Sequence, residues 1–384
     1  MKKNLFVAAS YVLVAALSSF CSLFLYSCLA LPPQSKLDEL SQLIEERYVE
    51  EPDMAALEDA AASAMVKATA DRWSYYISAA DYDKHMEQVE NAYVGVGITI
   101  QKAEEDAGFL IIAVAAGGPA EEAGFLPGDL LIAVEDEDVR GWSTTEVSAV
   151  VKGEEGTFVQ MTVLRQGDHR NITVERRQVL TPVAEYEMLE GNVGLVTIVN
   201  FDERCAQETI DAIETLRKNG AQKLIFDVRH NPGGYAHEMV EILDYLLPEG
   251  DLFRMVDSRG RESVDTSDAN CLEIPMAVLV NSGSYSAAEF FAAALQEYDA
   301  ALILGEPTSG KGYYQNTFRL SDGSAVALSV GKYYTPQGKS LEGVGIQPDI
   351  QVEVDEETAN AIYYGTLESA RDPYILRALE AMGN

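Results

Sequence analysis

The sequence predicts a multidomain α+β protein with an N-terminal membrane helix, a helical lead-in, a small β-rich domain and an α/β core. Three observations lead to this prediction. Residues 4–35 carry no charge, residues 92–178 have the spacing of short strands between glycine turns, and strands alternate with helices through most of residues 179–384. The 384 residues, 47% hydrophobic and 23% charged, suit a folded chain of two or three domains.

Residues 1–35 are predicted to be a signal anchor that crosses the cell membrane once. The uncharged run is longer than the roughly 20 apolar residues that span a bilayer, and longer than the core of a cleaved signal peptide. Lys2 and Lys3 precede it, which favours a cytoplasmic N-terminus and an extracytoplasmic location for everything after Ser35. A lipoprotein signal is the alternative, because residues 25–28 (LYSC) loosely resemble a lipobox, and a secreted form is another.

Composition argues against several classes of function. The formal net charge of −34 is unsuited to a nucleic-acid partner, because phosphate binding needs clustered Lys and Arg. The four histidines form no HExxH or HxH pattern, so neither a metal nor a cofactor is expected. Cys205 and Cys271 lack CxxC spacing, which leaves a disulfide open but favours two free thiols.

Residues 36–91 are predicted to be a helical cap region. SKLDELSQLIEERY places apolar residues at helical spacing, and MAALEDAAASAMVKA is rich in helix formers. The segment carries no obvious chemistry, which indicates a role in packing.

Residues 92–178 are predicted to be a compact β domain with two short helices. YVGVGITI and GFLIIAVA read as strands, and residues 157–179 read as a hairpin that turns at 166–168. Gly118-Pro119-Ala120 and the turn at 123–129 complete a pattern that resembles a PDZ domain of the bacterial protease-associated type. This resemblance implies that a peptide's C-terminal carboxylate binds the glycine loop and that the peptide adds to the sheet as a strand. The loop residues are Val94, Gly95, Val96, Gly97 and Ile98. The plain alternative is that these glycines only permit tight turns.

Residues 179–384 are predicted to form an α/β core with chemistry at the carboxyl ends of its strands. One polar stretch at such a place contains Ser286, between an apolar strand and an apolar helix. Backbone N–H groups at the start of a helix point into the space that this side chain enters. Ser286 and Glu289 also match the S-x-x-E capping box, and the GxSxG elbow is absent because Ala288 replaces its last glycine. The segment alone therefore favours a helix cap.

Two glycine-rich turns follow other strands. Residues 305–312 nearly match the phosphate loop GxxxxGK[ST], but Gly312 replaces the hydroxyl that would hold Mg²⁺, so nucleotide binding is rejected. Desolvation in a covered turn would lower the pKa of Lys311 from about 10.4 toward 7, although for an arbitrary lysine a solvated surface position is favoured. Gly233 follows a buried strand, where its N–H group suits a developing oxyanion or belongs to a plain turn.

Taken together, these segments resemble the carboxyl-terminal processing, or tail-specific, proteases from residue 37 onward. That family has a helical lead-in, a PDZ module and an α/β catalytic core in this order. Its serine-alanine-serine-alanine-serine-glutamate motif appears here at 284–289, with Ser286 at the reactive position. Its lysine and supporting glutamine match Lys311, 25 residues later, and Gln315, and its Asp-Leu-Arg-Asn-Asn-Pro-Gly-Gly segment matches 227–234. Tyr285, Ala288 and His230 depart from the commonest family residues.

The resemblance implies a crotonase-like or ClpP-like serine protease core. Ser286 would be the nucleophile, Lys311 the general base and Gln315 its support, and the N–H groups of Gly233 and Ala287 would form the oxyanion hole. Protein or peptide substrates would be recognised by their C-terminal tails through the PDZ domain. Dimers occur in the family, so a homodimer is an option that the sequence leaves open.

Three other functions are weighed against this one. A Ser-His-Asp hydrolase would use His230 or His237 with Asp227. An inactive PDZ scaffold would have no use for the spacing of Ser286, Lys311 and Gln315. A tethered nucleotidase would lack its Mg²⁺ ligands.

Overall fold

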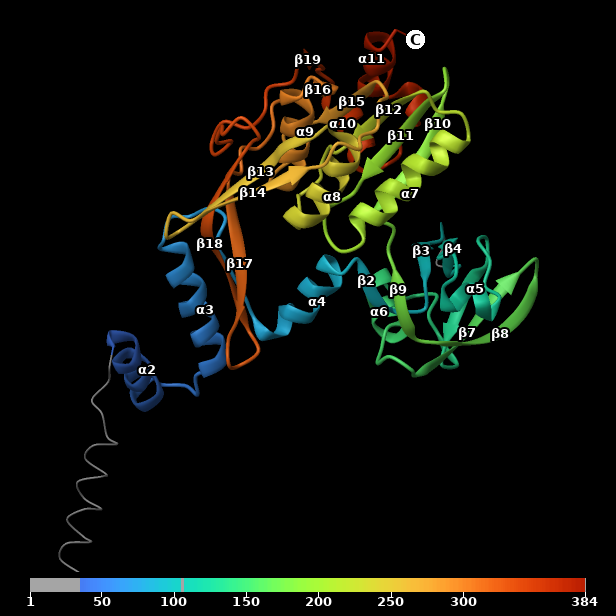
Figure 1. Cartoon of the computed structure of the whole chain (residues 1–384). Helices are drawn as coiled ribbons and strands as arrows, with labels where there is room; N and C mark the ends of the chain where they lie inside the picture. Colours follow the sequence, from blue (N-terminus) through green and yellow to red (C-terminus); the bar gives the residue numbers. More distant parts are fainter. Residues whose placement is uncertain (1–34, 105–106, 384) are drawn as a thin grey trace, which may run out of the picture. The chain divides into compact units, whose positions relative to one another are not determined.

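The computed structural model describes residues 35–104 and 107–383 (Figure 1). The chain divides into two compact units between Asp71 and Arg72. The predicted membrane segment therefore lies outside the described residues, except for Ser35. Within the described ranges, no helix combines the length and apolar character that crossing a bilayer requires. The membrane segment stays a prediction.

Two capped helices make up the described part of the first unit. Helix α2 (Lys36–Arg47) begins at a capping box, in which Ser35 and Asp38 each accept the other's backbone N–H through a side-chain oxygen. Helix α3 (Met54–Lys67) begins at Asp53, whose carboxylate accepts the Ala56 N–H at 3.0 Å. Both helices agree with the predicted spacing, and neither contains a buried residue.

The second unit begins with a strand inside the segment that was expected to be helical. Strand β1 (Tyr75–Ile77) pairs with β18 (Ala325–Tyr334), and helix α4 (Ala79–Val89) follows it. Aromatic and β-branched side chains favour a strand where a partner edge is available, and that partner is 250 residues away along the chain. The helical pattern is thus interrupted at residues 75–77.

An antiparallel sheet with its own core follows. The predicted hairpin is confirmed, because Arg165 pairs with Asp168 while Gln166 and Gly167 take positive φ angles of 53° and 92°. The two short helices predicted for this domain are α5 (Pro119–Ala123) and α6 (Thr144–Val151). The sheet order is β3 (Ile98–Lys102), β4 (Phe109–Val114), β5 (Leu130–Val134), β7 (Phe158–Arg165) and β8 (Asp168–Glu175), with β6 (Glu137–Asp138) beside β5, while β2 (Ala92–Gly95) and β9 (Arg177–Leu180) form a separate pair.

A mainly parallel sheet organises the α/β core. Its order is β10 (Ala184–Leu189), β11 (Val193–Ile198), β12 (Lys223–Asp227), β15 (Met276–Val280), β16 (Ala301–Gly305) and β19 (Ile350–Gln351). Only the β10–β11 pair of this sheet is antiparallel. Parallel pairing brings the carboxyl ends of β12, β15 and β16 to one edge, which is where the predicted polar stretches begin.

Helices cover both faces of this sheet. Leu224 and Phe226 point into a core shared with α7 (Cys205–Lys218), α8 (Ala236–Leu246) and α9 (Ala287–Glu297). Ile225 points the opposite way, toward α11 (Pro373–Ala381). This alternation follows from the two-residue period of a strand. The short elements α10 (Glu356–Tyr363) and η2 (Ser369–Arg371) precede α11.

A second antiparallel sheet supplies residues to the cleft that is described below. It contains β13 (Gly250–Asp257), β14 (Glu262–Ser267), β17 (Tyr313–Arg319), β18 and β1. Strand β14 is mostly exposed and polar, so it lacks the apolar period that identifies a strand from sequence. The two cysteines of the described chain, Cys205 and Cys271, are free thiols, which is the state that the sequence favours.

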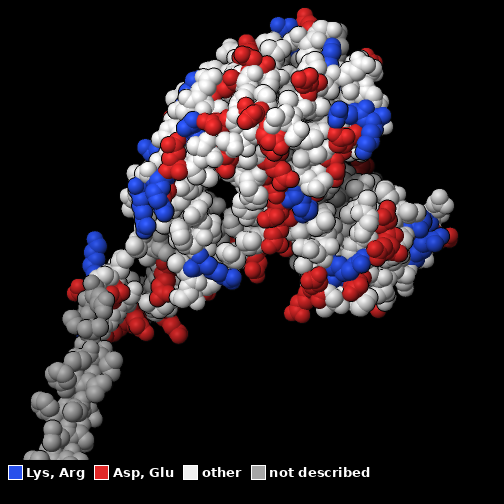
Figure 2. All heavy atoms as spheres, viewed as in Figure 1, with Lys and Arg blue, Asp and Glu red and all other residues white. Residues whose placement is uncertain are grey.

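Both signs of charge are spread over the visible surface. Figure 2 shows Lys and Arg in small groups interspersed with Asp and Glu on this face of the described chain. This distribution agrees with a surface that is solvated by mixed charge and that carries a net charge of −34.

Candidate active site

Ser286 occupies a strained turn at the carboxyl end of β15. Its φ and ψ angles are 58° and −127°, a conformation that non-glycine residues rarely adopt. The strand before it is entirely buried, and helix α9 begins at the next residue. The residue is only 7% exposed but lines a cleft. Strain of this kind is typical of a nucleophile that is held at the tip of a strand-turn-helix.

The Glu289 carboxylate joins this turn to the lysine loop. Its Oε2 accepts the N–H groups of Ser286 at 3.0 Å and of Lys311 at 2.8 Å. Its Oε1 accepts the Thr308 hydroxyl at 2.5 Å and the Gly310 N–H at 2.7 Å. Burial raises the pKa of Glu289, and these four hydrogen bonds oppose that effect. The residue that looked like a helix cap therefore holds both predicted catalytic segments.

Lys311 is partly buried beneath aromatic rings. Its Nζ lies 5.2 Å from the ring centroid of Trp73 and 5.7 Å from that of Tyr285. The amine therefore lies within cation–π distance of two aromatic rings. Arg72 fastens this loop, because its guanidinium donates to the Gly310 carbonyl at 2.7 Å. The sequence pattern gave no sign that residues 72 and 73 belong to the site.

The loop at 231–234 packs directly against the Ser286 turn. Gly233 has φ of +87°, and a Cβ there would lie 2.7 Å from the Ser286 Cβ and 2.9 Å from the Ala287 nitrogen. The Gly233 N–H donates to Asn231 Oδ1 at 2.8 Å, and the Asn231 carbonyl accepts the Tyr285 N–H at 3.1 Å. Gly233 and Ala287 are thus brought together beside Ser286 as predicted, and their oxyanion role stays a prediction. Asn231, which was not singled out, ties the two loops together.

Replacing Gly233 with alanine is expected to distort the site more than the fold. The new Cβ would clash with the Ser286 turn and would also strain a left-handed backbone. We expect kcat/KM for peptide cleavage to fall by at least about 100-fold, as is typical when one oxyanion donor is lost. Gly338→Ala is the matched control, since Gly338 has a φ of +76° but open space around its Cβ position. Similar losses in both variants would contradict a special role for Gly233.

Gln315 lies on β17 and lines the same cleft as Ser286 and Lys311. Its amide nitrogen donates to the Tyr313 carbonyl at 3.1 Å and to the Ser329 hydroxyl at 3.0 Å. These bonds hold the amide in one orientation. Its support of the lysine remains a prediction.

The cleft has a volume of about 820 Å³. Catalytic candidates from three separate segments meet in it, and aromatic side chains form much of its wall. The lining residues include Ser286, Lys311, Gln315 and Gly233, together with Trp73, Tyr75, Tyr235 and Tyr285. A cavity of this size accommodates several residues of an extended peptide.

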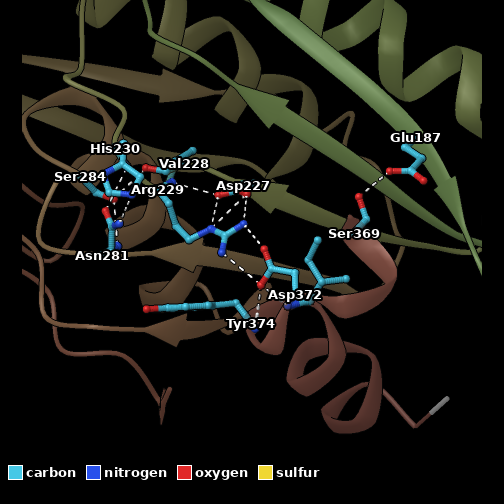
Figure 3. A network of polar contacts seen from close by, with 11 residues as sticks. Glu187, Asp227, Val228, Arg229, His230, Asn281, Ser284, Ser369, Asp372 and Tyr374 are labelled. Atoms are coloured by element: carbon cyan, nitrogen blue, oxygen red, sulfur yellow. Dashed lines mark hydrogen bonds and ion pairs between the residues drawn. The ribbon is translucent and has the colours of Figure 1, made fainter. Parts of the chain in front are cut away.

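The histidine alternative lacks a matching geometry. His230 Nε2 lies 2.8 Å from the Asn281 amide nitrogen, and the His230 ring stands edge-on to Tyr363. Figure 3 shows Asp227 turned toward Arg229, which also binds Asp372 at 2.8 Å. Burial, followed by the Arg229 charge, lowers the pKa of His230. His230 is thus engaged by Asn281 and does not line the cleft in the described chain.

His237, the other histidine candidate, is largely exposed. Its side chain is 68% accessible, it stacks on Tyr235, and its Nε2 lies 3.7 Å from Glu238. Asp227 is engaged by Arg229 instead. The geometry therefore favours Lys311 over either histidine as the base.

A small second pocket lies at the predicted tail-binding loop. Gly95, Val96, Gly97 and Ile98 line it, whereas Val94 does not. Lys152, which the sequence pattern did not single out, also lines it and lies 3.6 Å from Glu87. The glycine loop and a nearby ammonium group suit a peptide carboxylate.

Comparison with known proteins identifies similar chains. The family model described as "Peptidase family S41" matches residues 192–352, and the one described as "PDZ domain" matches residues 110–165. The chain is 30% identical over 369 residues to the "Carboxy-terminal processing protease CtpA" of Bacillus subtilis strain 168, covering 93% of this chain and 79% of that protein. It is also 30% identical to the "Probable CtpA-like serine protease" of Staphylococcus aureus strain COL, covering 83% of this chain and 64% of that protein.

One solved structure agrees in fold. An S41-family protein from Bacteroides fragilis is 19% identical with a TM-score of 0.53, over 87% of this chain and 90% of the other. At this level of identity the likeness concerns the fold alone. The arrangement of strands and helices described above is therefore shared with a solved member.

Proposed function

The chain belongs to peptidase family S41, among the carboxy-terminal processing proteases with a PDZ domain, and on this premise we propose that it is a serine endopeptidase with a Ser286–Lys311 dyad. The chain spans 64% of the length of the Staphylococcus aureus relatives that it matches. The activity proposed for it therefore depends on the residues of its own site. The observation that carries the proposal is Glu289, which binds the backbones of Ser286 and Lys311 with the same oxygen. This contact orients the two residues toward one cleft.

The proposed reaction is acyl transfer through a covalent intermediate. The neutral Lys311 amine accepts the Ser286 proton as Oγ attacks the peptide carbonyl. N–H groups of Gly233 and Ala287 would stabilise the oxyanion, for which the Gly233 N–H must exchange its bond to Asn231. The lysine then gives its proton to the departing amine, and water hydrolyses the acyl-enzyme.

Substrate selection is proposed to depend on the C-terminal tail. The pocket at Gly95–Ile98 offers glycine-loop backbone to a carboxylate, with Lys152 nearby. The partners would be proteins or peptides with a free C-terminus. The chain is further proposed to be anchored in the cell membrane through residues 1–35, with its catalytic part outside the cytoplasm, on the basis of the uncharged N-terminal run.

Covalent labelling tests the nucleophile. A serine-directed phosphonate is expected to label the wild-type protein and not Ser286→Ala, because Ser286 is the only serine among the described residues that line the cleft. Ser282→Ala is the matched control, since Ser282 is an exposed serine of the same loop. Undiminished labelling of Ser286→Ala would rule out the proposed nucleophile.

Tail recognition is tested with one peptide in two forms. The form with a free C-terminus is expected to be cleaved with a higher kcat/KM than its amidated counterpart, because the amide lacks the charge that the glycine loop would bind. Equal rates for the two forms would show that the carboxylate is not read.

A further inference from the structure

Asp202 is the only carboxylate among the described residues that line the catalytic cleft. The residue before it, Phe201, is bridged to the oxyanion loop, since its N–H donates to the Gly233 carbonyl at 2.8 Å and its carbonyl accepts the Tyr235 N–H at 2.7 Å. The same loop packs against Ser286. Asp202 therefore lies on the cleft wall that adjoins the nucleophile.

No hydrogen-bond donor and no cation contacts the Asp202 carboxylate within residues 35–104 and 107–383. The nearby Arg204 is engaged elsewhere, because its guanidinium binds Glu208 at 2.9 Å and three backbone carbonyls. Burial raises the pKa of Asp202 to about 7, with smaller contributions from Glu203 and Glu238. A partly buried carboxylate without a partner is costly and is compensated when a donor or a cation reaches it.

Aromatic rings share the cleft with this carboxylate. Burial raises the phenol pKa of Tyr75, Tyr235 and Tyr285, and the charge of Asp202 adds to this effect, for Tyr75 after the contribution of Tyr285. The three tyrosines line the same cleft. Tyrosine faces attract cations, and a central carboxylate adds an ion pair to that attraction.

We propose that Asp202, in the cleft that Tyr75, Tyr235 and Tyr285 also line, binds the cationic side chain of a substrate lysine or arginine close to the scissile bond. This inference rests on the proposed endopeptidase function and names the substrate feature that the cleft reads. The aromatic walls would contact the aliphatic stem, and Asp202 would pair with the charged end. The Asp202 site would bind a substrate side chain, and it is separate from the pocket at Gly95–Ile98, which would bind a C-terminal carboxylate.

A purely structural role explains the Asp202 side chain less well than substrate binding does. The start of α7 uses the Asp202 backbone, because its carbonyl accepts the Cys205 N–H at 3.1 Å. The buried carboxylate that binds the Ala206 N–H belongs to Glu238 instead. Asp202→Asn keeps the shape and removes the charge, so it is expected to fold.

The test uses a peptide series in which lysine or norleucine occupies each of three positions on either side of the cleaved bond. For wild type, lysine is expected to raise kcat/KM over norleucine by about tenfold at one position, as for a partly desolvated ion pair with a cation–π contact. Asp202→Asn is expected to lose this preference while still cleaving the norleucine peptide. Glu203→Gln is the matched control, because Glu203 is exposed and does not line the cleft.

Binding of the same peptides to Ser286→Ala, measured by fluorescence anisotropy, separates the two proposals. Lysine preference in binding without cleavage by wild type would overturn the endopeptidase function and support the Asp202 site. Cleavage or binding with no lysine preference at any position would overturn the Asp202 site and leave the protease proposal intact. A lysine preference that persists in Asp202→Asn would also overturn the Asp202 site.

Discussion

Replacing Lys311 with alanine is expected to lower kcat/KM for peptide cleavage by about 10²–10⁴-fold, the range for loss of a general base. Replacing His230 with alanine is expected to leave turnover within about threefold of wild type, because His230 binds Asn281 and does not line the described cleft. Steady-state kinetics on one fluorogenic peptide checks both results, and circular dichroism verifies that each variant is folded.

A second lysine provides the control for this experiment. Lys332 is exposed on β18, with its Nζ over the Tyr313 ring, so Lys332→Ala removes the same side chain at a position outside the lining of the described cleft. Its activity is expected to remain near that of wild type. Near-normal turnover in a folded Lys311→Ala variant would make the dyad untenable, and a large loss in His230→Ala alone would revive the histidine alternative.

Replacing Glu289 with alanine is expected to reduce both stability and turnover. Four donors, three of them buried, would lose their acceptor, and each buried loss costs about 1–3 kcal/mol. The free energy of unfolding is therefore expected to fall by about 4 kcal/mol or more. The loops of Ser286 and Lys311 would also lose their common anchor, which is expected to lower kcat by at least about 100-fold.

Two further variants separate positioning from general destabilisation. Glu289→Gln keeps the shape but turns an NH₂ group toward donors, so its kcat is expected to lie between those of wild type and Glu289→Ala. Glu297→Gln disturbs the same helix far from the cleft, where that carboxylate binds Thr335 at 2.9 Å and the Gln337 N–H at 2.8 Å. It is expected to lose stability and retain kcat. Equal kcat losses in Glu289→Gln and Glu297→Gln would contradict a positioning role.

Strand pairing between distant segments explains most of what the sequence pattern missed. Strand β1 forms because β18 offers an edge to Tyr75–Ile77, and this pairing brings Arg72 and Trp73 to the lysine loop. A window of neighbouring residues contains no trace of a contact 238 residues away. Strands with exposed, charged faces, such as β14, likewise lack the apolar alternation that identifies a strand locally.

The sequence by itself predicted the order of the α/β core, because strand and helix periods are local properties of the chain. Its resemblance to the tail-specific proteases pointed to Ser286, Lys311 and Gln315 as the candidate residues. The tertiary structure decided what each residue contacts. Glu289 matched a helix cap locally, yet parallel pairing of β15 with β16 brings the lysine loop to the same carboxylate. Asp202 stands out only because folding places it, partly desolvated and without a partner in the described chain, in the cleft beside Ser286.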